Sequence, residues 1–435
     1  MFIRQLWFLY NVMRRQWYDI EKLKKFQEKN FIKIFQHAYN NSTFYRKKFK
    51  EVNINLNDIK RLDDLRKLPF TTKEEIIKNF PDNMITNEFK MRRLHYKKTS
   101  GSSGLQMTLV SDQRCEDYYD CIYGRALFAI GYIPWQSMAY FWAQPRDYFW
   151  YPTYHKKKIY DYFGLMRKHW MDSTLSPEEQ MKVLTKMRPK IIYCFPTTLV
   201  AISKIIGKNR EKYKDIQPKF IISHGETLFK ESRKYIESVF NCPVYNEYGT
   251  TEFVRMGWEC KEKQGLHLDI DSIIVEIVKD GKICSPGEMG ELVITGLHNY
   301  AMPLIRYRIG DVGMISDKPC KCGRGLPLLK TIEGRNEDFL ILPSGRMLSP
   351  RNIGPPIEKF SQVTEFKFVQ ETKDRMILYL VDNPYITSIV ISNIVKELYR
   401  VIGEYVDIKV QIVKQLDKTE RGKMQAIVSK VKFNS

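Results

Sequence analysis

Residues 191–252 decide the fold class of this chain, and they read IIYCFPTTLVAISKIIGKNREKYKDIQPKFIISHGETLFKESRKYIESVFNCPVYNEYGTTE. Short apolar runs typical of buried strands occur three times in this stretch. These runs are Ile191–Phe195, Phe220–Ser223 and Val244–Tyr248. The segments between them, 197–208 and 228–240, have helical patterns. Strands that alternate with helices predict a layered α/β body.

The pattern changes on both sides of this stretch. Upstream, Met138–Trp142 is a further strand candidate, and residues 1 to about 90 are predicted to be mainly helical, with helices over 18–39 and 72–80. Downstream, residues 265 to about 334 are β-rich, with glycine and proline turn signals between short strands.

Residues 335–435 predict a smaller α+β module of a size that folds alone. FLILPSGRMLSP indicates a hairpin, and FKFVQETKDRMILYLVD indicates two strands. A helix near 388–402 and a strand in VDIKVQIVK complete the module.

Composition narrows the class of protein. The 435 residues are 43% hydrophobic and 13% aromatic, which is typical of a globular chain with two or three domains. The formal net charge of +21 favours an anionic partner, but the lysines are scattered and no nucleic-acid motif is present. We therefore expect no nucleic-acid partner. Anionic substrates or an acidic membrane surface fit the charge equally well.

Localisation is predicted from the cysteines and the opening residues. Eight cysteines without disulfide-like density favour a reducing, cytoplasmic location. Residues 1–18 mix Arg4, Arg14 and Arg15 into a helical apolar pattern, without the apolar block or cleavage site of a signal peptide. We expect a helix that packs on the body, with peripheral membrane contact through residues 1–18 as the alternative.

KTSGSSGLQMTLV, residues 98–110, is a candidate phosphate-binding loop. Its glycines let the backbone approach an anion, and its hydroxyl and amide groups supply donors. The candidate residues are Ser100, Gly101, Ser102, Ser103 and Gly104. No Gly-Lys-Ser or Gly-Lys-Thr follows, so the loop is not a Walker A motif.

Three further motifs contain polar groups suited to a nucleotide. In VYNEYGTTE, Tyr248, Gly249, Thr250, Thr251 and Glu252 combine hydroxyls with a hard oxygen ligand, as a magnesium–phosphate complex requires. In RYRIGD, Asp311 could accept both hydroxyls of a ribose. Arg335 precedes the C-terminal module, and Lys423 lies in the polar segment TERGKMQ. A lysine in such a segment is more often solvated surface.

In this order and spacing the four motifs resemble the adenylate-forming superfamily of acyl-CoA synthetases, adenylation domains and luciferases. The strongest resemblance is to its phenylacetate–CoA ligase branch and CapK-type relatives, and it includes FQHAYNNSTFYRKKF and LRKLPFTTKEEI. It implies a large adenylation domain with layered sheets and a small, mobile C-terminal lid. We expect a helical segment over 1–90, a nucleotide- and acid-binding body over 91–334 and the lid over 335–435.

The resemblance implies an enzyme that uses ATP and Mg²⁺ to form an acyl-adenylate and then transfers the acyl group to coenzyme A. Residues 100–104 would hold the β- and γ-phosphates, and Gly225 and Glu226 of SHGET would line the adenine pocket. Tyr248 would stack on the base. Thr251 would bind phosphate, and Glu252 would bind magnesium.

The resemblance also assigns the remaining residues. Asp311 would hold the ribose with Arg335 nearby, and Lys423 would bridge the carboxylate and the α-phosphate. Two departures from the family pattern put activity in question. Leu105-Gln106 replaces the usual Lys-Pro pair, and Glu337, followed by Asp338, occupies the hinge position where aspartate is common.

A zinc site is predicted from a Cys-x6-His pair and a Cys-x-Cys pair. Thiolate and imidazole ligands from two chain segments suit a closed tetrahedral zinc ion. The candidate ligands are Cys260, His267, Cys320 and Cys322. The phenylacetate–CoA ligase branch has a similar cysteine arrangement. The alternative is reduced cysteines and an unrelated histidine.

The identities of the acid and the acceptor remain open at this stage. Aromatic residues at strand ends suit a flat, apolar acid, although they are equally typical of a core. The pocket candidates are Phe141, Trp142, Tyr193, Phe195 and Pro196. One alternative is an enzyme that passes the acyl group to an amine or sugar in cell-surface polysaccharide synthesis. Another is an interaction protein, associated with membrane or nucleic acid, on a degenerate adenylation fold.

Overall fold

The computed structural model describes residues 2–99, 106–142, 168–335, 339–360, 362–417 and 424–431. Its described residues form two compact units. The first contains residues 2–99, 106–133 and 247–332, and the second contains residues 134–142, 168–246 and the described residues from 333 onward. The predicted boundaries at 90 and 334 remain a prediction, since this division groups the residues differently.

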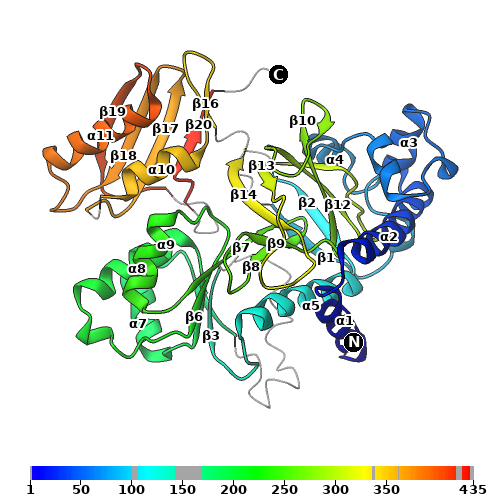
Figure 1. Cartoon of the computed structure of the whole chain (residues 1–435), viewed down its shortest axis with the longest axis horizontal. Helices are drawn as coiled ribbons and strands as arrows, with labels where there is room; N and C mark the ends of the chain where they lie inside the picture. Colours follow the sequence, from blue (N-terminus) through cyan, green and yellow to red (C-terminus); the bar gives the residue numbers. More distant parts are fainter. Residues whose placement is uncertain are drawn as a thin grey trace. The chain divides into compact units, whose positions relative to one another are not determined.

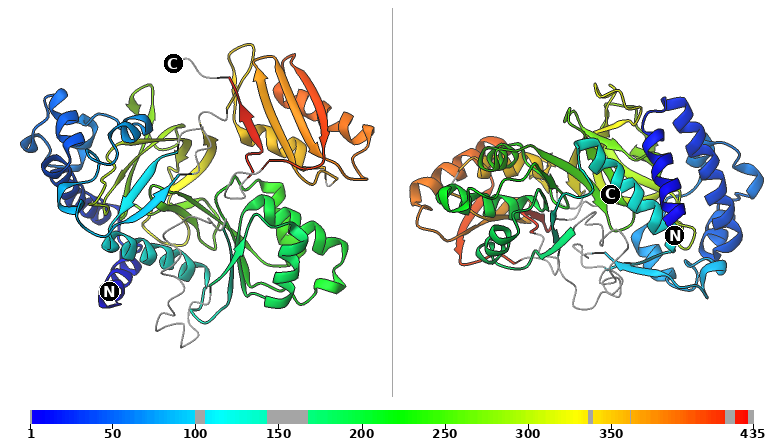
Figure 2. Two further views of the ribbon diagram at one scale, coloured as in Figure 1. Left: turned by 180° about the vertical axis from the view of Figure 1, so that it is seen from behind. Right: turned by 90° about the horizontal axis from the view of Figure 1, so that it is seen from below.

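The first unit begins with helices that cover an antiparallel sheet. The helices are α1 (Phe2–Arg15), α2 (Ile20–Asn41), α3 (Thr43–Glu51), α4 (Lys73–Asn79) and α5 (Gln113–Ile130). Short 3-10 helices lie at η1 (Leu56–Asp58), η2 (Leu62–Lys67) and η3 (Asn87–Phe89). Asp19 caps α2 by accepting from the Lys22 amide, which explains where the chain turns after α1. Figures 1 and 2 show α1 lying along α5.

The sheet of the first unit has the order β11-β10-β12-β13-β14-β9-β8-β7. Its strands are β7 (Val244–Thr250), β8 (Val254–Glu259), β9 (Leu266–Leu268), β10 (Ile273–Lys279), β11 (Lys282–Ile283), β12 (Gly290–Gly296), β13 (Tyr307–Ile315) and β14 (Leu328–Arg335). Phe31, Ile34 and Phe35 of α2 share a buried core with Trp258 of β8. A separate hairpin, β1 (His95–Lys98) with β2 (Thr108–Ser111), flanks the candidate phosphate loop.

The second unit contains the parallel sheet that residues 191–252 predict. Its strands are β3 (Met138–Trp142), β4 (Lys168–Asp172), β5 (Ile191–Cys194), β6 (Phe220–Ser223) and the first residues of β7, in the order β4-β3-β5-β6-β7. One face is covered by α7 (Pro177–Met187), α8 (Pro196–Lys208) and α9 (Lys230–Phe240) (Figure 1). A 3-10 turn, η4 (Glu211–Tyr213), follows α8. Strand β5 ends before Phe195 because Pro196, with its fixed φ, starts α8.

The C-terminal part of the second unit is the predicted α+β module. It contains β15 (Leu340–Ile341), β16 (Met347–Leu348), α10 (Pro350–Glu358), β17 (Phe366–Thr372), β18 (Arg375–Val381), α11 (Ser388–Ile402), β19 (Asp407–Val413) and β20 (Ile427–Ser429). The sheet order is β19-β18-β17-β20, and α10 and α11 contribute to its core (Figure 2). The predicted hairpin, strands and helix are confirmed. No described helix is long and apolar enough to cross a bilayer.

Candidate active site and metal centre

Two predicted nucleotide-binding residues contact each other in the first unit. The Tyr248 hydroxyl, on β7, donates a hydrogen bond to the Asp311 carboxylate, on β13. Both side chains are half-buried. A phenol beside a carboxylate provides an aromatic face and a ribose-hydroxyl acceptor at one place. The structure therefore brings together the two groups that the sequence assigned to base and ribose.

The turn after β7 holds the predicted magnesium ligand. The Tyr307 hydroxyl donates to Oε1 of Glu252 at 3.3 Å, and Oγ1 of Thr250 accepts from the Phe253 amide at 3.3 Å. Gly249 is required here, because a Cβ atom would lie 2.0 Å from the Val254 carbonyl oxygen. Tyr307 was not singled out from the sequence, although it lies in the same RYRIGD motif as Asp311.

In the second unit, both carboxylate oxygens of Glu226 are engaged. Its Oε2 accepts from the amide and the hydroxyl of Thr197, at 3.1 and 2.8 Å. Its Oε1 accepts from the Met424 amide at 3.0 Å. Gly225 has a φ of +77°, a left-handed conformation that favours glycine. Glu226 thus joins the start of α8 to the residue that follows Lys423.

Aromatic rings gather at the carboxyl ends of the parallel strands. His224 stacks on Tyr193 with ring centroids 4.1 Å apart, and it lies 4.6 Å from Phe195 and 5.7 Å from Trp142. Tyr140 also stacks on Tyr193, with ring centroids 4.4 Å apart. The sequence analysis did not single out His224, because a histidine beside a strand has no diagnostic spacing.

Not every predicted pocket residue joins this aromatic group. Phe141 is instead fully buried in the core, packed with the residues beneath α7, α8 and α9. Side chains alternate along a strand, so Phe141 points away from the face that carries Tyr140 and Trp142. Pro196 is buried at the first position of α8.

Several predicted residues lie outside the described part of the chain. These are Ser100, Gly101, Ser102, Ser103, Gly104, Leu105, Glu337, Asp338 and Lys423. Arg335 is described only as the last residue of β14. Two described residues that flank the candidate phosphate loop, Thr99 and Met107, exchange hydrogen bonds. The Thr99 amide donates to the Met107 carbonyl at 2.9 Å, and the Thr99 hydroxyl accepts from the Met107 amide at 2.9 Å.

The four predicted zinc ligands converge in the first unit. Their ligand atoms all lie within 4.8 Å of one another. The Sγ atoms of Cys260 and Cys320 are 3.6 Å apart, and Sγ of Cys322 is 3.3 Å from Nε2 of His267. A tetrahedral zinc ion with ordinary bond lengths spaces such ligands about 3.5–3.8 Å apart. The donor set and its spacing therefore fit a structural zinc ion.

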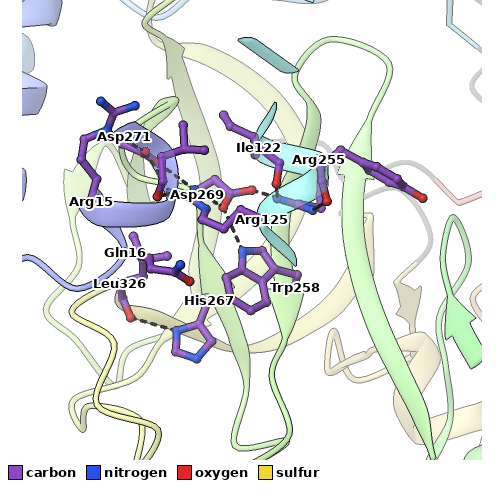
Figure 3. Close-up of polar contacts among 12 residues, drawn as sticks. Arg15, Gln16, Ile122, Arg125, Arg255, Trp258, His267, Asp269, Asp271 and Leu326 are labelled. Carbon is purple, nitrogen blue, oxygen red and sulfur yellow. Dashed lines mark hydrogen bonds and ion pairs between the residues drawn. The ribbon is translucent and has the colours of Figure 1, made fainter. Parts of the chain in front are cut away.

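The surroundings of His267 prepare it to act as a ligand. Its Nδ1 donates to the Leu326 carbonyl at 3.2 Å (Figure 3), which leaves Nε2 free to face Sγ of Cys322 at 3.3 Å. Burial lowers the pKa of His267 to about 4, so the ring is neutral. Burial also raises the pKa of the Cys260 thiol to about 12. A divalent cation would offset the electrostatic penalty of a buried thiolate there.

A buried ion-pair cluster lies next to His267 of the candidate metal centre (Figure 3). Arg125 of α5 pairs with Asp269 at 2.5 Å and with Asp271 at 2.8 Å, and all three side chains are buried. Arg255 contacts Asp269 at 3.1 Å, and Arg15 contacts Asp271 at 3.0 Å. Burial alone would raise the pKa of Asp271, but the two arginines hold it well below its usual range. The cluster joins α1, α5 and β8 to the segment after β9.

Comparison with proteins of known sequence identifies two kinds of relative. A phenylacetate–coenzyme A ligase of Thermus thermophilus is 25% identical over 339 residues, which cover 74% of this chain and 72% of the ligase. Protein CapK of Staphylococcus aureus is 27% identical over 427 residues, which cover 95% of this chain and 91% of CapK. Residues 340–430 match the family model of the CapK C-terminal domain.

A solved structure confirms the predicted fold class. The crystal structure of 2-hydroxyisobutyryl-CoA ligase in the postadenylation state, in complex with 2-HIB-AMP, has a TM-score of 0.80 and 16% identity. The match covers 96% of this chain and 91% of that ligase. At this identity the likeness shows the fold alone. The chain is thus similar in sequence to phenylacetate–CoA ligases and to CapK, and it has the fold of an acyl-CoA ligase.

Proposed function

We propose that this chain is an ATP-dependent acid–CoA ligase, which forms an acyl-adenylate and then transfers the acyl group to coenzyme A. The observation that carries the proposal is the pairing of Tyr248 with Asp311, two groups suited to a base and a ribose. The second support is the hydrogen bond from Met424 to Glu226, which ties the chain next to Lys423 to the predicted adenine pocket. The phenylacetate–CoA ligase relatives support the same reaction class.

The proposed first half-reaction brings a carboxylate to the α-phosphorus of ATP, with pyrophosphate as the leaving group. Two anions must approach, so the chain contributes charge neutralisation and positioning. Lys423 would neutralise the carboxylate and the α-phosphate together. Residues 100–104 would hold the β- and γ-phosphates, with Thr251 beside them. Asp311 and Arg335 would orient the ribose.

Glu252 is the proposed magnesium ligand. Its half-buried carboxylate receives a hydrogen bond from Tyr307, which fixes the orientation of one oxygen. A magnesium ion bound there supplies positive charge to the phosphates. Gly249 and Thr250 shape the turn that presents this carboxylate.

Zinc at Cys260, His267, Cys320 and Cys322 is proposed to be structural. The four side chains would occupy all four positions of a tetrahedral ion, so none would be left for a substrate. The ion would fix β8 and β9 to the loop between β13 and β14.

The acid is proposed to be flat and apolar, such as an aryl acid. The support is the group formed by Trp142, Tyr193, Phe195 and His224 at the strand ends, where α/β sheets commonly bind ligands. Release of pyrophosphate, measured across aryl, fatty and sugar acids, tests this proposal. Turnover with aryl acids supports it, and turnover only with sugar acids would exclude it.

The CapK relative favours a second acceptor class, because it matches 95% of this chain. In this alternative the adenylate passes its acyl group to an amine or a sugar for a cell-surface polysaccharide. Incubation of acid and ATP with coenzyme A, amines or sugars, each separately, distinguishes the two. If no acid provokes release of pyrophosphate, the remaining alternative is an interaction protein on a degenerate fold. A cytoplasmic location is proposed from the free cysteines.

A further inference from the structure

Helix α1 is apolar on two faces, whereas a surface helix usually has one. Its inner face packs Phe8 and Val12 against α5. Its outer face carries four large side chains at helical spacing. These are Ile3, Leu6, Trp7 and Tyr10, with exposed fractions of 83%, 50%, 60% and 59%. Packing on the body therefore accounts for only one of the two faces.

The helix presents this outer face from a fixed position. Arg4 pairs with the buried Asp117 of α5, and Arg15 pairs with the buried Asp271 (Figure 3). Both ends of α1 are thus held to the first unit by charged contacts. A partner would meet a preformed surface, so little ordering would oppose binding.

Aromatic and basic side chains continue this surface beyond the helix. Trp17 is 54% exposed, and Arg14 is exposed with Nη1 donating to the Tyr10 hydroxyl at 3.0 Å. At the start of α2, Lys22 and Lys24 are also exposed, with 68% and 55% of each side chain accessible, and each pairs with an exposed carboxylate, Asp19 and Glu21 respectively. Tryptophan and tyrosine prefer the boundary between water and hydrocarbon, and lysine and arginine attract anionic headgroups.

The net charge of the chain distinguishes between two binding partners for the outer face of α1, a second copy of the chain and an anionic membrane. A second copy would bring together two chains that each have a formal net charge of +21. Repulsion between them opposes self-association, whereas an anionic surface attracts the same charge. We propose that the outer face of α1 docks on an anionic membrane surface, with Leu6, Trp7 and Tyr10 in the interfacial layer and Arg14 among the headgroups. The helix lies on the bilayer and does not cross it.

Co-sedimentation of the full chain with vesicles tests this proposal. Binding is expected to vesicles of phosphatidylcholine with phosphatidylglycerol, to weaken as salt is added, and to be at least roughly tenfold weaker with phosphatidylcholine alone. Leu6→Ser, Trp7→Ser and Tyr10→Ser combined should lower binding to the anionic vesicles roughly tenfold or more. The matched control is Ile389→Ser with Tyr405→Ser, two exposed apolar residues of the C-terminal module, which should leave binding unchanged.

Arg14→Glu is a second variant that leaves the apolar side chains in place. It should weaken binding to anionic vesicles and leave residual binding to neutral ones unchanged. Equal binding by wild type and the triple variant would overturn the proposal, as would equal binding to both vesicle types. A dimer in sedimentation equilibrium that the triple variant converts to a monomer would also overturn it, because the outer face would then bind a second copy. Binding is independent of the proposed ligase reaction, so pyrophosphate release should be unchanged in the triple variant.

Discussion

The Met424 amide donates a hydrogen bond of 3.0 Å to Oε1 of Glu226, which lies 198 positions earlier in the chain. Glu226 follows a strand of the parallel sheet, whereas Met424 belongs to the C-terminal module and directly follows Lys423. Consecutive Cα atoms are about 3.8 Å apart, so Glu226 holds the chain close to the proposed catalytic lysine. We propose that this contact gives Glu226 a positioning role beside its predicted place at the adenine.

Glu226→Ala should therefore slow the formation of the acyl-adenylate. The substitution leaves the amides of Thr197 and Met424 without their acceptor and releases the segment next to Lys423. We expect roughly 10²-fold slower ATP–pyrophosphate exchange, within the range for losing a positioned polar contact. Glu226→Gln keeps one carbonyl acceptor and should retain more of the rate. Equal exchange by Glu226→Ala and wild type would contradict the positioning role.

Loss of a zinc ligand should remove the metal and destabilise the first unit. Metal analysis of the purified chain should find about one zinc per chain, because the four ligands form one closed site. Cys260→Ala should lower the zinc content and the temperature of unfolding. Cys284→Ala is the matched control, because Cys284 is half-exposed and is not among the four ligands. If the wild-type chain contained no zinc and Cys260→Ala left the temperature of unfolding unchanged, a structural zinc ion would be excluded.

Breaking the buried ion-pair cluster should strongly destabilise the chain. Asp271→Ala leaves Arg15 and Arg125 buried without one of their carboxylates. The expected loss is about 3–5 kcal/mol in the free energy of unfolding, measured by denaturant. Glu291→Ala, which breaks a pair with the half-exposed Arg308, should lose less than about 1 kcal/mol. Similar losses of unfolding free energy in both variants would contradict the claim that burial makes the ion-pair cluster more important for stability than an exposed pair.

The raised pKa of Glu358 predicts that the stability of the second unit depends on pH. Burial between α9 and α10 raises the pKa of Glu358 to about 7, although Ser232 donates to its Oε2 at 2.5 Å and the charge of Lys204 favours ionisation. Nearby Glu231 opposes that ionisation. Because the folded pKa exceeds the unfolded value, the stability from this group is present at low pH and is lost as pH rises through about 7.

Glu358→Gln should consequently raise the free energy of unfolding at pH 8 by about 2 kcal/mol and have a much smaller effect near pH 4.5. Denaturant titrations at the two pH values measure this difference. Glu211→Gln is the control, because the Glu211 side chain is 91% exposed and should show little change at either pH. An equal effect of Glu358→Gln at both values would show that the carboxyl ionises normally in the folded chain.

Local patterns predicted much of the fold. Three elements occur where the sequence indicates them: the strands Met138–Trp142 and Phe220–Ser223 and the helix Ser388–Ile402. Each has the pattern of apolar residues that is typical of its type of element. Helix α5, Gln113–Ile130, was not predicted. It buries Asp117 and Arg125, and buried charges disrupt the apolar periodicity that marks a helix.

Only part of the candidate site was predicted, because local motifs can be recognised in the sequence and contacts between distant residues cannot. The four candidate zinc ligands were predicted from their spacing, and the structure brings their ligand atoms together. The contact between Tyr248 and Asp311 joins residues from two motifs that the sequence identified separately. The ion-pair cluster was missed because Arg125 lies 144 positions from Asp269, and pairing over that separation leaves no local pattern. The sequence could not show that Phe141 belongs to the core and Trp142 to the aromatic group, because this depends on which face of the strand each side chain occupies.

The half-reactions of Lys423→Ala test the proposed function most directly. One assay measures ATP–pyrophosphate exchange, and the other measures transfer from a supplied acyl-adenylate to coenzyme A. The proposal predicts that the substitution abolishes exchange and leaves transfer close to the wild-type rate, since the lysine acts only where the carboxylate meets the α-phosphate. Equal loss of both half-reactions, or exchange that survives without the lysine, would contradict it.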